Sequence, residues 1–251
     1  MSFIDIDNII MNYRDGESEQ LALNNISFSV SKGEFLCIIG SSGCGKTTLL
    51  RIMAGFLRPT NGRVLYNGKE LLKPRMEYAF IFQNQEQLFP WKTALQNVLY
   101  PLKLKKVDKG IQMRLAEEYF NKVNLNFNDD SSKYPHQLSA GMKQRVTLAR
   151  ALAMNPSLLF MDEPFSSVDK YIRDNLHKVL LQLWKEFNLT IIFITHDIDE
   201  AIRLSSRIII LGKGHHGIVG DFKNNVVGER YPTDNGYSEL WNTLYNGIGN
   251  G

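Results

Sequence analysis

The chain has 251 residues, of which 43% are hydrophobic, and this is enough to bury the core of one domain with a subdomain. Its net charge of +3, without a dense block of lysine and arginine, argues against a nucleic-acid partner. No apolar run approaches the ~18 residues of a membrane span, and the acidic start lacks the basic segment of a signal peptide. The two cysteines, Cys37 and Cys44, form no disulfide framework. We therefore expect a cytosolic protein.

The first third of the chain predicts strands and turns. One apolar run contains Cys37, which we expect to be a small core residue. A glycine-rich loop follows this run and leads into a helix. The predicted elements are strands over residues 26–30, 34–39, 62–67 and 78–82, and a helix over residues 46–55.

Residues 87–153 carry a helical pattern. Ile111, Leu115 and Tyr119 recur at four-residue spacing in a helix predicted over 108–123, and Ser139 is a suitable N-cap for another that ends near Met154. Apolar strands and helices then alternate, which implies a mostly parallel sheet covered on both faces. These elements are strands over 158–161, 190–194 and 207–211, and helices over 169–187 and 198–205.

Residues 40–47, Gly-Ser-Ser-Gly-Cys-Gly-Lys-Thr, match the pattern G-x-x-x-x-G-K-[ST] of a phosphate-binding loop, or P-loop. The glycines let backbone N–H groups turn toward phosphate oxygens, and the following helix adds its positive N-terminal end. We expect Lys46 to contact the β- and γ-phosphates of ATP and the Thr47 hydroxyl to bind Mg²⁺. The other predicted binding residues of the loop are Gly40, Ser41, Ser42, Gly43, Cys44, Gly45 and Thr48. The alternative is a glycine-rich turn without a ligand, which the preceding strand and following helix disfavour.

Cys44 lies in this loop beside Lys46, at a helix N-terminus. Such surroundings stabilise a thiolate. We therefore expect Cys44 to react with maleimides when the loop is empty and to be protected by MgATP.

Residues 158–163, Leu-Leu-Phe-Met-Asp-Glu, end an apolar strand with two carboxylates. Ligands of open α/β sheets bind at this end of the strands. We expect Asp162 to hold Mg²⁺, directly or through water, and Glu163 to polarise the water that attacks the γ-phosphate. The alternative is that the carboxylates only cap the next element, but an intact P-loop in the same chain favours the catalytic interpretation.

Residues 138–145, Leu-Ser-Ala-Gly-Met-Lys-Gln-Arg, fit the pattern L-S-x-G-x-x-Q-R and resemble the signature motif of the ATP-binding cassette (ABC) family. The resemblance implies that two such domains pair head to tail. Ser139, Gly141 and Gln144 of one copy then close over the ATP held by the P-loop of the other, since a helix N-terminus, a hydroxyl and a glycine can approach a phosphate closely. The family most often has glycine where this chain has Ala140, whose methyl group is expected to loosen the clamp slightly. The alternative is an ordinary capped amphipathic helix.

Further family elements occur in the expected order. Gln83 resembles the Q-loop glutamine that senses Mg²⁺ and the partner, and residues 166–169 resemble the D-loop, which places Asp169 at the nucleotide. His196 resembles the switch histidine beside the γ-phosphate, although a lone histidine is more often an ordinary surface or core residue. Tyr13 resembles the aromatic residue that stacks on adenine, although an N-terminal tyrosine often only packs.

The resemblance covers about residues 3–222. It implies an α/β fold of the P-loop NTPase type, in which a mostly parallel core sheet carries an antiparallel N-terminal β region and an inserted α-helical subdomain. The predicted organisation is one nucleotide-binding domain over 1–223, with its core in 1–86 and 156–223 and its helical subdomain in 87–155, followed by a C-terminal tail over 224–251.

A finer resemblance lies in residues 83–91, where Leu88-Phe89-Pro90-Trp91 matches the Leu-x-Pro-Trp element of nitrate, sulfonate and taurine importers. Two interpretations of its aromatic residues stay open. In one, Phe89 and Trp91 line a docking groove for a membrane permease, since large aromatic residues often dominate interfaces. In the other, Trp91 is a core anchor of the loop.

The sequence thus predicts an ATPase subunit of an ABC transporter, bound at the cytoplasmic face of the cell membrane and importing a small anion. The expected partners are a second copy of the chain, integral membrane permease subunits and a separate solute-binding protein. One alternative is an ABC-type switch that acts on ribosomes or DNA, which a single cassette without sustained heptads disfavours. The other is a scaffold without turnover, which Glu163 and His196 argue against.

Overall fold

The computed structural model describes residues 2–15, 18–83, 87–228 and 235–249. Two compact units make up the chain: one consists of the residues up to Arg75 and those from Thr190 onward, and the other of Met76–Leu189. Within these described ranges, no helix combines the length and the apolar character needed to cross a membrane.

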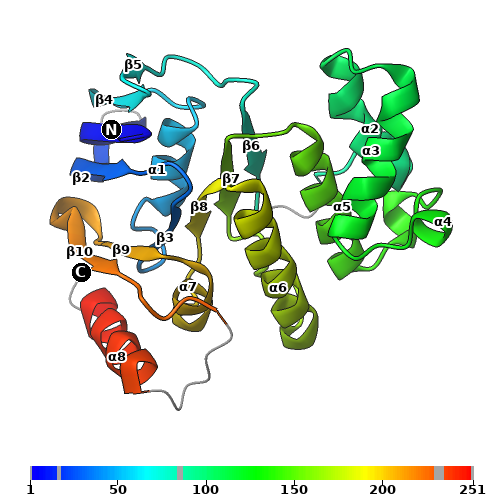
Figure 1. Cartoon of the computed structure of the whole chain (residues 1–251). Coiled ribbons are helices and arrows are strands. Elements are labelled where there is room, and N and C mark those ends of the chain that lie inside the picture. Colours follow the sequence, from blue (N-terminus) through cyan, green and yellow to red (C-terminus); the bar gives the residue numbers. More distant parts are fainter. Residues whose placement is uncertain (1, 16–17, 84–86, 229–234, 250–251) are drawn as a thin grey trace. The chain divides into compact units, whose positions relative to one another are not determined.

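The first unit contains two sheets. In one, β1 pairs antiparallel with β2 and β4, and β4 with β5. In the other, β3 pairs parallel with β8 and β9, while β10 lies antiparallel to β9. The elements are β1 (Ile4–Asp15), β2 (Ser18–Val30), β3 (Phe35–Ile39), α1 (Lys46–Met53), β4 (Asn61–Tyr66), β5 (Lys69–Glu70), β8 (Thr190–Ile194), α7 (Ile198–Leu204), β9 (Arg207–Leu211), β10 (Ile218–Lys223) and α8 (Asn235–Gly249) (Figure 1).

The parallel strands are the core of this unit. Every residue of β3 and β8 is buried, and both strands are almost entirely apolar, as is typical of strands covered on both faces. Cys37 is fully buried in β3, so its predicted role as a core residue is confirmed. The strands predicted over 190–194 and 207–211 match β8 and β9, and the antiparallel N-terminal region is confirmed as well.

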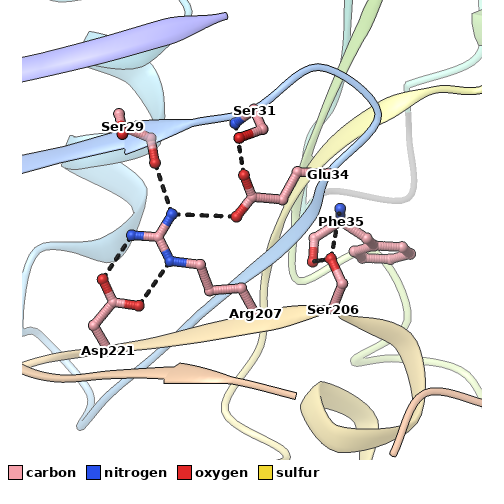
Figure 2. A network of polar contacts seen from close by, with 7 residues as sticks. All are labelled: Ser29, Ser31, Glu34, Phe35, Ser206, Arg207 and Asp221. Atoms are coloured by element: carbon pink, nitrogen blue, oxygen red, sulfur yellow. Dashed lines mark hydrogen bonds and ion pairs between the residues drawn. The ribbon is translucent and has the colours of Figure 1, made fainter. Parts of the chain in front are cut away.

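Arg207, at the start of β9, joins the two sheets (Figure 2). Its guanidinium donates to the Ser29 carbonyl oxygen of β2 at 2.7 Å and forms ion pairs with Glu34 at 3.2 Å and with Asp221 of β10 at 2.6 Å. The hydrogen bonds to Asp221 raise the pKa of Arg207, and those to Glu34 add to the effect. This network fixes the antiparallel sheet, which carries Tyr13, to the parallel sheet, which carries the P-loop.

The second unit is mainly helical. Its helices α2, α3 and α5 pack together (Figure 1), and α5 also packs against α6 and β6. Ser139 caps α5 by accepting a hydrogen bond from the Met142 N–H, which confirms the predicted N-cap. The elements are β6 (Tyr78–Ile81), α2 (Ala94–Leu104), α3 (Lys109–Lys122), α4 (Phe127–Asp130), α5 (Ala140–Ala153), β7 (Leu158–Asp162) and α6 (Lys170–Phe187), with β6 parallel to β7.

The segment after Asn224, for which the sequence predicted only a tail, contains helix α8. This helix packs on α7, β9 and β10, with Tyr237 and Leu244 as buried anchors. The predicted limits of the helical subdomain, residues 87–155, stay a prediction, since the second compact unit also includes β6, β7 and α6.

Candidate nucleotide-binding and catalytic site

The P-loop connects β3 to α1 and needs glycine at two points. Gly40 and Gly45 have φ angles of 156° and 100°. A Cβ at Gly40 would lie 2.3 Å from the Leu211 carbonyl oxygen, and one at Gly45 would lie 2.6 Å from that of Ala22. Both positions therefore combine a left-handed backbone with close approach of another strand, and only glycine satisfies both. At Gly43 a Cβ would meet nothing within 4 Å, so the loop borders open space there.

Lys46 is held inside this loop. Its side chain is buried, and Nζ donates to the carbonyl oxygens of Gly40 at 2.9 Å and Ser41 at 3.0 Å. The ammonium group thus lies at the N-terminus of α1, where the helix dipole also favours an anion. With the hydroxyls of Thr47 and Thr48 in the first turn, this set of donors fits a polyphosphate and its magnesium ion.

Tyr13 of β1 lies beside the P-loop helix, as the resemblance implied. Its hydroxyl is 3.1 Å from the Thr48 Oγ1, and its side chain is 41% exposed. The ring is therefore accessible next to the first turn of α1. Stacking on adenine stays a prediction.

The expectation of a reactive thiolate at Cys44 is wrong. The side chain is only 1% exposed, and burial raises the pKa of its thiol. Lys46 Nζ lies 3.9 Å from Sγ and lowers this pKa, but its effect is smaller than that of desolvation. The loop therefore keeps Cys44 as a neutral buried thiol.

Maleimide should consequently label neither cysteine of the folded chain at an appreciable rate at neutral pH. Burial raises the pKa of the Cys44 thiol, and the thiolate is the form that reacts with maleimide. Mass spectrometry after short exposure, with and without MgATP, should give equal and low labelling, and denaturant should make both cysteines reactive. Rapid labelling of Cys44 in the folded chain would contradict this result.

In the second unit, β7 ends at Asp162, which is 2% exposed, and Glu163 follows directly. Glu163 has a φ of 43°, a left-handed conformation that costs a residue other than glycine about 1–3 kcal/mol. The turn is fixed because Ser166 donates to the Glu163 carbonyl oxygen through its N–H at 3.3 Å and its hydroxyl at 3.1 Å. Such strain is typical of functional sites, and the motif alone gave no sign of it.

Gln83 and Glu163 lie together, although they are far apart in the sequence. Gln83 Nε2 donates to Glu163 Oε2 at 3.3 Å. The structure therefore joins the predicted Q-loop glutamine to the predicted catalytic carboxylate. Residues 84–86, which continue the Q-loop, lie outside the described residues.

The signature segment begins α5. A Cβ at Gly141 would lie 2.5 Å from Ile172 Cγ2 of α6, so this glycine is also needed for the contact between the two helices. Gln144 is 3% exposed, and its Nε2 has no hydrogen-bond partner in the described part of the chain. The Gln144 side chain therefore lies in the interior, and its contact with the nucleotide stays a prediction.

The remaining predicted residues lie at the ends of secondary-structure elements. Asp169 caps α6 by accepting a hydrogen bond from the Ile172 N–H at 3.1 Å. His196 is exposed between β8 and α7. Each unit therefore carries part of the predicted site: the first has Tyr13, the P-loop and His196, and the second has Gln83, Ser139, Gly141, Asp162, Glu163 and Asp169.

Trp91 is 69% exposed, so the interpretation of this residue as a core anchor is wrong. Leu88, which is 4% exposed, anchors the loop instead. Beside the loop lies a cavity of about 340 Å³ whose lining includes Tyr78, Phe80, Phe89, Tyr100, Leu104 and Arg150. The loop thus presents aromatic side chains next to an apolar hollow.

Asn97 of α2 holds this loop, and sequence reasoning missed it. Its fully buried side chain accepts a hydrogen bond from the Phe89 N–H at 2.8 Å and donates to the carbonyl oxygens of Lys92 at 3.2 Å and Thr93 at 3.0 Å. A single asparagine thereby satisfies the backbone of the turn that carries Trp91. Its place among apolar residues in the helical pattern of residues 87–153 was the available signal.

Comparison with known proteins agrees with this geometry. A family model described as "ABC transporter" matches residues 23–166, which include the P-loop, the signature segment and both carboxylates. The chain belongs to the ABC transporter family. As a member of this family, the cassette is an ATPase that binds ATP with Mg²⁺.

Two relatives illustrate the subtype of this cassette. The bicarbonate transport ATP-binding protein CmpD of Synechocystis is 39% identical over 88% of this chain and 78% of its own length. The aliphatic sulfonates import ATP-binding protein SsuB of Bacillus thuringiensis is 42% identical over 87% of this chain and 84% of its own length. The predicted resemblance to importers of this type is confirmed.

A solved structure supports the fold and the chemistry. The dimeric ATP-binding cassette MJ0796, in a post-hydrolysis state bound to ADP and Pi, has a TM-score of 0.78 and 31% identity. The match covers 88% of this chain and 99% of that one. The predicted P-loop NTPase fold is therefore confirmed, and the dimeric form of that cassette supports the predicted pairing of two copies.

Proposed function

We propose that this cassette pairs head to tail with a second copy and, at the cytoplasmic face of a membrane, drives a permease that imports a small anion. The observation that carries the proposal is the exposed Trp91, whose ring packs on Phe89 at the lining of an apolar cavity, in a cassette whose relatives are named for bicarbonate transport and sulfonate import. Nitrate, a sulfonate such as taurine, and bicarbonate share the required chemistry, a compact anionic group.

The residues divide the work of hydrolysis. Backbone N–H groups of the P-loop and the Lys46 amine bind and orient the phosphates, and Glu163 accepts a proton from the attacking water. His196 donates a hydrogen bond to the γ-phosphate, and Tyr13 holds the adenine. Thr47, Asp162 and Gln83 would hold Mg²⁺, whose charge would offset the negative charge of the phosphates.

The signature segment acts in the other copy. Ser139 and the N-terminus of α5 face the phosphates bound by the P-loop of the second copy, and Asp169 lies near the same interface. A helix N-terminus suits this task, because its backbone donors and dipole favour an anion. Hydrolysis then depends on closure of the pair.

Gln83 links this chemistry to the permease. At one end of the Q-loop, Gln83 donates a hydrogen bond to Glu163. At the other end, Gln87 and Phe89 contact Arg150. Arg150 donates to the Gln87 carbonyl oxygen at 2.7 Å and lies 5.6 Å from the centre of the Phe89 ring. A partner helix seated against Phe89 and Trp91 would therefore contact the stretch of chain that begins at Gln83, which donates a hydrogen bond to the catalytic carboxylate.

Trp91→Ala should weaken permease binding by about tenfold or more, because exposed aromatic residues beside a pocket are frequent hot spots. The melting temperature of the isolated cassette should hardly change, since surface substitutions usually alter stability by less than about 0.5 kcal/mol. Co-purification with the permease and thermal unfolding measure the two effects. Tyr245→Ala, which removes an aromatic residue that is 59% exposed on α8, is the matched control. Unchanged permease binding by Trp91→Ala would contradict the proposed docking site.

The overall proposal is tested in proteoliposomes that contain the cassette, its permease and the solute-binding protein. ATP should drive uptake of one labelled anion among bicarbonate, nitrate and sulfonates, and the Glu163→Gln cassette should support none. A cassette that hydrolyses ATP but never associates with a membrane protein would favour the alternative of an unattached ABC-type switch.

A further inference from the structure

The segment that follows β10 is hydrogen-bonded to the C-terminal end of α7. Asn224 Nδ2 donates to the carbonyl oxygens of Ile202 and Ser205, both at 2.7 Å and both buried. The Gly228 N–H donates to the Arg203 carbonyl oxygen at 3.0 Å. These bonds satisfy carbonyl groups that a helix leaves without partners at its C-terminus.

Helix α8 holds the other end of α7. The Tyr237 hydroxyl donates a hydrogen bond to the carboxylate of Asp199, in the first turn of α7. Tyr237 is 2% exposed, and burial, together with the Asp199 carboxylate, raises the pKa of its hydroxyl, which therefore remains a donor. The segment after β10 thus contacts α7 at both ends.

His196 lies between two fixed points of the same unit. On one side, Thr195 is tied to the core, because its N–H donates to the Ile38 carbonyl oxygen at 3.4 Å and its hydroxyl accepts from the Asp197 N–H at 3.0 Å. On the other side, Asp197 caps α7, and Asp199 is only three residues from His196. A shift of the first turn of α7 therefore moves His196.

We propose that Tyr237 is a positioning residue for ATP hydrolysis, because its hydrogen bond to Asp199 sets the first turn of α7 and thereby the place of His196. The proposal rests on the role of His196 given above. The proposal gives helix α8 a role in catalysis, although α8 follows all the cassette motifs in the sequence and contains none of them.

Tyr237→Phe in the full chain removes the hydroxyl and keeps the ring. We expect kcat to fall by about tenfold while KM for ATP stays within about twofold, as follows from misplacement of one group that acts in the transition state. Asp199→Ala should lower kcat by the same factor, whereas Asp199→Asn, which can still accept the hydrogen bond, should keep most of the wild-type kcat. The double variant Tyr237→Phe/Asp199→Ala should have a kcat no lower than that of either single variant. Tyr245→Phe, on the exposed side of α8, is the matched control.

An NMR signal from His196 distinguishes a positioning role of Tyr237 from a purely structural one. The imidazole NMR resonance of His196, assigned with His196→Ala, should shift in Tyr237→Phe, while those of His136 and His177 in the other unit stay in place. A lower melting temperature with unchanged kcat and an unchanged His196 resonance would overturn the positioning role. A wild-type rate in His196→Ala would instead contradict the proposed function of His196. The shift of the His196 resonance in Tyr237→Phe would still report the contact between Tyr237 and Asp199.

Discussion

Replacing Glu163 with glutamine is expected to lower the rate of ATP hydrolysis by about 10²–10⁴-fold, the usual contribution of a general base. The amide keeps the size of the side chain and its hydrogen bond to Gln83, but it cannot accept the proton of the attacking water. Binding of MgATP should persist, since the P-loop is unchanged. Unhydrolysed nucleotide should then hold two copies together.

Two measurements test this result. A phosphate-release assay gives the rate, and size-exclusion chromatography with MgATP shows whether the variant elutes as a dimer. Glu117→Gln makes the same chemical change at an exposed position of α3 and should behave like wild type. A wild-type rate for Glu163→Gln would remove Glu163 from the catalytic site.

Lys46→Ala should weaken MgATP binding by about 30- to 100-fold, equivalent to ~2–3 kcal/mol, which is typical of lost hydrogen bonds from a charged donor. The reason lies in the geometry, since the buried ammonium group is held in the loop by the carbonyl oxygens of Gly40 and Ser41. No other side chain of the P-loop carries a positive charge.

Isothermal titration with MgATP measures this loss, and a thermal melt checks that the variant remains folded. Lys32→Ala removes an exposed lysine of the same unit and should bind normally. If Lys46→Ala bound MgATP with wild-type affinity, the phosphates would have to lie elsewhere.

Local patterns predicted most of the core. β8 and β9 are apolar runs with clear ends, and the Ser139 cap marks the start of α5. β1 was not recognised as one long strand, because Asn8 has a φ of 51° and the pairing register shifts between Ile6 and Ile9, which interrupts the alternation.

The misses at Cys44 and α8 share one cause, since each depends on residues distant in the sequence. Burial decides the chemistry of Cys44, and the loop that buries it also packs against Leu211. Helix α8 is rich in asparagine and glycine, which are poor helix formers, so Tyr237 and Leu244 stabilise it through contacts with the core. Neither the burial of Cys44 nor the packing of α8 on the core can be recognised from the residues adjacent to them in the sequence.

Gly141 connects the signature segment to α6 in a way that bears on how such cassettes diverge. Any side chain at this position would press against Ile172, because a Cβ there would lie 2.5 Å from the Ile172 Cγ2. The size of residue 172 therefore limits which residues position 141 can accept, so the residue types at these two positions should covary among homologous chains. One position of the signature motif is thus tied to the residue that it meets on α6.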